Sequence, residues 1–157
     1  MTRRLLPVAL ALAAAIPVAS EGRAQINAGL HVARAAKSFD GVTGVGGSLE
    51  LSLPVLPVDL VLAGEYFFPS CDGCSLWGGS LDVHLPLLPL PVLRPYTAAG
   101  LVLRNIDASD TSVRAGGFGL GGGVKLTTPG LGAFAEARYE ILDGSGDQFV
   151  LRLGLRL

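Results

Sequence analysis

From residue 25 onward the chain alternates between apolar and polar side chains with a period of two residues, and this pattern limits the fold more than any other feature. Such alternation places the two kinds of side chain on opposite faces of a strand, whereas a helix repeats every 3.6 residues. Eight segments follow the pattern, each roughly as long as the 9–11 residues with which a tilted strand crosses a bilayer. They are residues 25–34, 44–53, 58–68, 76–85, 93–104, 116–126, 132–142 and 148–157.

The connections between these segments alternate in character. Three are compact and rich in apolar residues and turn formers, at residues 54–57, 86–91 and 127–131. Four are polar, at residues 35–43, 69–75, 105–115 and 143–147. The chain has 22 glycines and 10 prolines, which disfavour long helices. Three turns and four loops are what an antiparallel up-and-down meander of eight strands requires, so we predict an all-β, eight-stranded barrel over residues 25–157.

Residues 1–24 have the features of a secretory signal peptide. Arg3 and Arg4 form a basic start, residues 5–19 form an apolar core too short to span a bilayer as a helix, and small residues precede a cleavage site after Ala24. Cleavage after Ala19 and an uncleaved anchor are the alternatives. The formal net charge of the whole chain is −1, so we expect no nucleic-acid partner.

Apart from Arg34, the last residue of the first segment, the charged residues within the eight segments fall on the polar face. When each segment is assigned one apolar face, these twelve charged residues lie opposite it. They are Glu50, Asp59, Glu65, Asp82, Glu136, Glu140, Arg94, Arg104, Lys125, Arg138, Arg152 and Arg156. The six acidic and six basic side chains balance, so we expect them to pair.

The apolar faces carry too many large Leu, Phe, Trp and Tyr side chains for an eight-stranded interior, which is only just wide enough to be filled by side chains. We therefore place the apolar faces against lipid and the charges in the lumen, as a transmembrane barrel that is closed because lipid cannot satisfy a free sheet edge. The paired charges predict a plugged lumen without an open pore. A small channel is the alternative.

Aromatic side chains gather on the apolar faces, toward the loop end of their segments. They are Tyr66, Phe68, Trp77, Phe118, Tyr139 and Phe149. Amphipathic rings are favoured at a membrane–water interface, so this set predicts an aromatic girdle.

Two short motifs bear on chemistry. Cys71 and Cys74 form a C-x-x-C in a polar loop of an exported chain, where an intraloop disulfide is the leading interpretation. Residues 117–122 match the G-x-G-x-x-G of dinucleotide sites, but that motif must join a strand to a helix, and these glycines lie inside an alternating strand. We expect no cofactor and no metal site.

The chain resembles the small outer-membrane β-barrels of the OmpA/OmpX type over nearly all of residues 25–157. The resemblance rests on the glycine-rich segment 116–125, on residues 134–139 and on the closing strand 149–157, which ends in Leu157 where such barrels usually have an aromatic residue. It implies a place in the bacterial outer membrane, contact with outer-membrane lipid and insertion by the barrel-assembly machinery. It also implies a structural or surface-interaction role and no enzymatic activity, with the ligand of the loops unknown.

Some barrels of this size act on lipid A as deacylases or acyltransferases, and such a lipid-modifying enzyme is the alternative function. An acyl-transfer site would need a histidine with a serine or acidic partner near lipid. The only histidines are His31 and His84, both on the polar face. His31 is the one to examine, because Ser48 or Glu50 on the next segment would be its partner.

Overall fold

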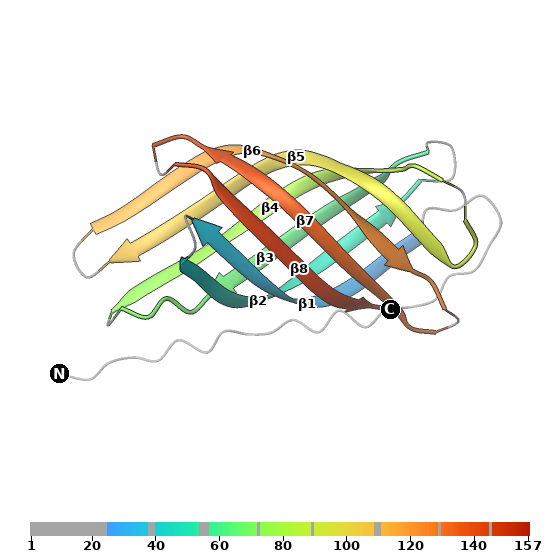
Figure 1. Ribbon diagram of the computed structural model, residues 1–157, viewed down its shortest axis with the longest axis horizontal. Helices are drawn as coiled ribbons and strands as arrows, with labels where there is room; N and C mark the ends of the chain where they lie inside the picture. Colours follow the sequence, from blue (N-terminus) through green and yellow to red (C-terminus); the bar gives the residue numbers. More distant parts are fainter. Residues whose placement is uncertain are drawn as a thin grey trace.

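The computed structural model describes residues 25–37, 40–53, 57–71, 73–88, 90–108, 111–128, 130–144 and 146–157, so the predicted signal peptide at residues 1–24 lies outside the described residues. Eight strands form one closed barrel (Figure 1). They are β1 (Gln25–Lys37), β2 (Asp40–Ser52), β3 (Asp59–Phe67), β4 (Cys74–Pro86), β5 (Leu93–Ala108), β6 (Thr111–Leu126), β7 (Gly132–Leu142) and β8 (Gln148–Arg156).

Each strand pairs antiparallel with the next, and β1 pairs with β8 to close the barrel. The predicted fold, an eight-stranded up-and-down barrel, is therefore confirmed. In Figure 1 the C-terminus lies at the turn end of the barrel, and the β5–β6 connection lies at the opposite end. Within the part of the chain that the structure describes, no helix is long and apolar enough to cross a membrane.

Several strands run further on the loop side than the sequence predicted. A loop was expected over residues 105–115, but β5 continues to Ala108 and β6 begins at Thr111, so that boundary was wrong. Strands β1 and β2 likewise take up most of the loop expected over residues 35–43. The alternation marks where side chains meet lipid, whereas an antiparallel ladder is held by backbone hydrogen bonds and continues beyond that point.

The two faces of the barrel wall differ in composition. Large apolar side chains cover the outside, among them Leu30 at 70% and Phe118 at 64% exposure. The inside holds charged side chains, and Arg138 and Asp82 are fully buried there. An exposed apolar surface of this extent does not suit water, so the outer wall is built to face hydrocarbon.

The glycines of β6 make room for the largest lumen side chains. A Cβ atom on Gly119 would lie 2.6 Å from Nε of Arg138, and one on Gly123 would lie 2.7 Å from the hydroxyl of Tyr96. The G-x-G-x-x-G stretch therefore serves packing within a strand, where any side chain on the inner face would displace these groups.

Candidate functional site

The middle of the lumen is occupied by a network of ion pairs that joins opposite walls. Arg104 on β5 places Nη1 2.5 Å from Glu65 Oε2 on β3 and Nη2 2.6 Å from Glu140 Oε1 on β7. Arg152 on β8 contacts Glu65 through Nε, and its Nη1 lies 2.8 Å from Glu136 Oε1. Glu65 thus joins two arginines from different strands, and its side chain is 1% exposed. We name these five residues the central network.

A second pair lies beside the central network. Arg138 on β7 contacts Asp82 on β4, and both side chains are fully buried. Ser80 donates a hydrogen bond to the second oxygen of Asp82 at 2.7 Å. Burying unpaired charges is costly, so pairing and hydrogen bonding explain why these side chains remain inside.

A third group of charges lies toward the turn end. Lys125 on β6 lies 2.7 Å from Glu50 on β2 and 2.8 Å from Asp59 on β3, and Arg156 lies 3.1 Å from the other oxygen of Glu50. The ammonium of Lys125 lies over the ring of Tyr96, and its Nζ is 4.9 Å from the ring centroid. Because the hydroxyl of Tyr96 also donates a hydrogen bond to Glu136 at 2.9 Å, this group connects to the central network.

Of the twelve charged residues that the sequence placed in the lumen, nine are buried there and Asp59 and Arg156 are partly exposed. Arg94 is exposed, and the structure does not bring it into a network with the others. It is the second residue of β5, at the rim where the wall ends and water replaces protein partners.

Apolar side chains close the loop end of the lumen. Phe67 and Val150 are fully buried and pack with Ala33 and Ala35. The guanidinium carbon of Arg104 lies 5.4 Å from the centroid of the Phe67 ring, so this apolar cap rests on the central network. Sequence reasoning did not single out Phe67, although it shares the face of Glu65, two residues before it.

The turn end of the lumen is open. A cavity of about 550 Å³ lies there, lined among others by Asn27, Arg94, Lys125, Tyr96 and Arg156. A much smaller cavity of about 30 Å³ shares several of these residues and reaches further into the barrel. The ion pairs therefore fill the middle of the lumen, while its turn end remains hollow.

The two histidines line the smaller cavity. Nε2 of His31 lies 3.4 Å from Glu65, and Nε2 of His84 lies 3.3 Å from Glu136, both without the geometry of a hydrogen bond. Ser48 and Glu50 line the same small cavity as His31, but within the described residues neither forms a hydrogen bond or an ion pair with it. Backbone pairing sets His31 opposite Gly46. Neither histidine faces the outer wall, where an acyl chain would lie.

The predicted girdle residues lie on the outer wall, and each is between 41% and 64% exposed. Cross-strand pairing brings two of them side by side, since Tyr66 on β3 pairs with Trp77 on β4. Tyr139 on β7 pairs with Phe149 on β8, and its hydroxyl donates a hydrogen bond to Asp147 at 2.8 Å.

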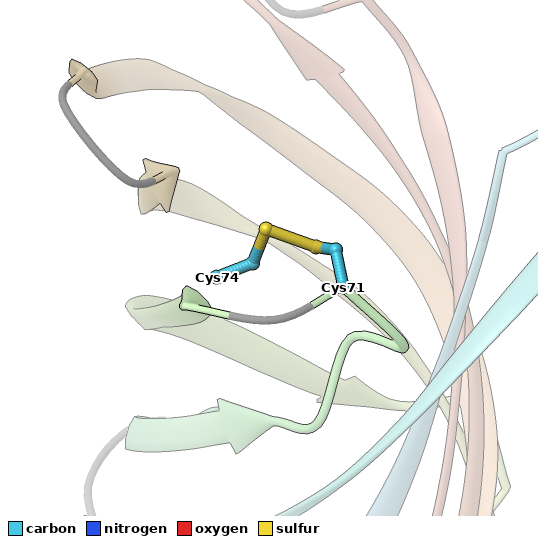
Figure 2. Close-up of a disulfide and its surroundings, with 2 residues drawn as sticks. All are labelled: Cys71 and Cys74. Carbon is cyan, nitrogen blue, oxygen red and sulfur yellow. A yellow bond between two sulfur atoms is a disulfide. The ribbon is translucent and has the colours of Figure 1, made fainter.

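Cys71 and Cys74 are joined by a disulfide at the loop end, between β3 and β4 (Figure 2). Their Cα atoms are 5.5 Å apart, within the range that a disulfide spans. Among the described residues, no group of three or more His, Cys, Asp or Glu side chains is placed to hold a metal ion.

Comparison with solved structures gives matches to outer-membrane barrels. The N-terminal β-barrel domain of Pseudomonas aeruginosa OprF superposes with a TM-score of 0.61 at 22% identity, over 86% of this chain and all of that one. Neisserial surface protein A gives a TM-score of 0.59 at 17% identity, over 86% of this chain and 98% of that one. Ail, the attachment invasion locus protein of Yersinia pestis, gives 0.59 at 14% identity, over 88% of this chain and all of that one, in a complex with the heparin analogue sucrose octasulfate.

The fold is that of the eight-stranded outer-membrane barrels. The expected resemblance to barrels of the OmpA/OmpX type is thus confirmed at the level of the fold. No protein-family model matches the chain, and no curated protein matches it in sequence.

Proposed function

We propose that this chain is a non-conducting barrel of the bacterial outer membrane with a structural or surface-interaction role. The observation that carries the proposal is the closure of the lumen by the central network together with the apolar cap around Phe67. Eight strands leave an interior just wide enough for side chains, and open pores generally need larger barrels. The apolar outer wall and the fold shared with OprF, NspA and Ail support the outer-membrane location.

The surface-interaction part of the proposal rests on the loop end. Strands β5 and β6 are each 16 residues long and form the longest hairpin of the barrel, so its tip stands beyond the apolar band. Two of the proteins with this fold are described as a surface protein and an attachment protein, which supports contact at the cell surface.

The turn-end cavity favours a second candidate, a small channel. A cavity of about 550 Å³ reaches Lys125 and Tyr96, and the central network, the Arg138–Asp82 pair and the cap separate it from the loop end. A transient opening of the ion pairs would connect the two sides. The geometry favours the closed barrel, because Arg104 and Glu65 are almost completely buried and each has partners on two other strands.

Membrane insertion and conductance test the proposal separately. The outer-membrane fraction of expressing cells should contain the chain as a band that changes its gel mobility after boiling. The purified barrel, reconstituted into planar bilayers, should show no conductance steps above those of protein-free bilayers, with a general porin as the positive control. Regular conductance steps from a folded preparation would refute the closed barrel and support the channel. A chain that is a soluble monomer without detergent would refute both proposed functions.

A further inference from the structure

A polar patch interrupts the outer wall of the barrel at the loop end of β4, β5 and β6. Backbone pairing sets Trp77 opposite Asn105 and Asn105 opposite Arg114, so their side chains form one row on the outer wall. The next row toward the tip contains Ser75, Asp107 and Ser112, paired in the same way. We name these six residues the outer polar patch.

The depth of the patch in the membrane follows from the apolar stretches of β5 and β6 that lie between it and the turn end. On the outer face of β5, the side chains from Leu93 to Leu103 are apolar except for Thr97, and Leu103 is 70% exposed. On β6, the outer face from residue 116 to Leu126 is apolar or glycine. Each span is 11 residues long, which suffices for a tilted strand to cross the hydrocarbon layer. The next outward residues, Asn105 and Arg114, therefore lie at the level of the lipid headgroups.

Hydrogen bonds hold the patch in one arrangement. Asn105 accepts a hydrogen bond from Nε of Arg114 at 3.3 Å and donates one to Asp107 at 2.8 Å. The hydroxyl of Ser75 donates a hydrogen bond to the same oxygen of Asp107 at 3.2 Å. The side chain of Asn105 is only 6% exposed, so it serves to orient its neighbours.

Arg114 is exposed, and within the described residues its two terminal nitrogens have no hydrogen-bond or ion-pair partner. A guanidinium held at Nε presents its remaining N–H groups as a fork that matches two oxygens of a phosphate. Beside it, the hydroxyls and the carboxylate of the patch are suitable partners for sugar hydroxyls. Trp77, which is 47% exposed, adds an amphipathic ring of the kind favoured at this depth.

We propose that the outer polar patch binds the phosphorylated sugar headgroup of an outer-leaflet glycolipid, with Arg114 contacting the phosphate. The inference rests on the proposed outer-membrane location and deepens it, because it assigns a lipid class to one place on the barrel. The apolar spans of β5 and β6 accept the acyl chains below, and the patch accepts the headgroup above. Asp107 opposes a phosphate electrostatically, so the phosphate must lie on the Arg114 side and the sugar over Asp107.

Trp77 is the only tryptophan of the chain, so its fluorescence reports on this patch alone. The folded full-length barrel is reconstituted into phosphatidylcholine nanodiscs, and diphosphorylated lipid A replaces part of the lipid at constant total amount. We expect a saturable change in emission with the wild type. Arg114→Ala should weaken the apparent affinity about tenfold, the effect of losing one charge-assisted contact. Arg114→Lys, which retains the charge without the fork, should fall between the two.

Two controls separate a site from general attraction of anions. Arg34→Ala removes an exposed positive charge from the loop end of β1 and should leave the titration unchanged. Dephosphorylated lipid A, and phosphatidylglycerol at equal charge, should give no saturable change. Any one of three results would overturn the proposal. These are a loss of affinity from Arg34→Ala equal to that from Arg114→Ala, an Arg114→Ala variant with the affinity of the wild type, and a response to phosphatidylglycerol equal to that to lipid A. The conductance of the barrel is measured independently, so failure of this site leaves the closed-barrel proposal standing.

Discussion

Neutralising Glu65 is the most direct test of how the lumen is held together. Its two carboxylate oxygens contact Arg104 and Arg152, and His31 lies 3.4 Å away. The substitution Glu65→Gln preserves the shape of the side chain but removes its charge. It also turns one acceptor oxygen into an NH₂ group that faces a guanidinium donor, so two donors oppose each other inside the barrel.

The expected loss of stability depends on the ion pairs that the two arginines keep. Removing one partner of a buried ion pair costs about 3–5 kcal/mol, because the other charge stays buried and unpaired. Here Arg104 retains Glu140 at 2.6 Å and Arg152 retains Glu136 at 2.8 Å. We therefore expect the free energy of unfolding to fall by about 3 kcal/mol, the lower end of that range.

Urea unfolding of the barrel in detergent micelles measures this loss, with fluorescence of Trp77 and the gel mobility of unboiled samples as two probes of folding. Arg94→Gln is the matched control, since it removes a charge at the exposed rim and should change the free energy by less than about 0.5 kcal/mol. In the double variant Glu65→Gln with Arg104→Met, the loss should be no smaller than in Glu65→Gln alone, because buried Glu140 then loses its arginine partner as well. If Glu65→Gln cost less than about 1 kcal/mol, the central network would not be a stabilising plug, and the reasoning would fail.

Two further predictions concern the wall and the hairpin tip. Gly117→Ala should destabilise the barrel by about 1–3 kcal/mol in the same urea assay, because its Cβ would meet the carbonyl oxygen of Ile141. The adjacent Gly116→Ala, whose Cβ finds its nearest atom at 3.6 Å, should cost nothing, and equal losses from both would contradict this packing. At the tip, a hydrogen bond with Ser112 lowers the pKa of the Asp107 carboxyl below its usual 3.8. This carboxylate thus stabilises the hairpin above pH 3.8, and the stabilisation is lost as the pH falls through the lowered pKa. An NMR titration of Asp107 with its midpoint at or above 3.8 would contradict this prediction.

Much of the barrel was predictable from local pattern alone. Adjacent residues such as Tyr139 and Glu140 differ in polarity, and they lie on opposite faces, the first exposed and the second buried. The period of two requires this in any strand, whatever its neighbours are. The strand count and the antiparallel order followed from the alternation of turns and loops, since each connection joins adjacent strands.

The ends of the strands were predicted less well, because alternation and pairing depend on different interactions. Beyond Leu103 the outer face of β5 becomes polar, so the apolar pattern stops there, yet backbone hydrogen bonds carry the strand to Ala108. The resulting hairpin tip brings together the hydrogen-bonded side chains around Asn105. No local signal placed these residues side by side.

The sequence by itself determined which side chains face lipid and which face the lumen, because a strand offers only two faces and lipid does not accept charges. Only the tertiary structure decided the partners: Arg104 meets Glu65 and Glu140, which are 39 and 36 residues away. The closure of the barrel sets which strands face each other across the lumen, and the stagger of the strands sets the height of each side chain. The loop end is closed because Phe67 of β3 and Val150 of β8 pack together there with alanines of β1, a contact that no single strand specifies.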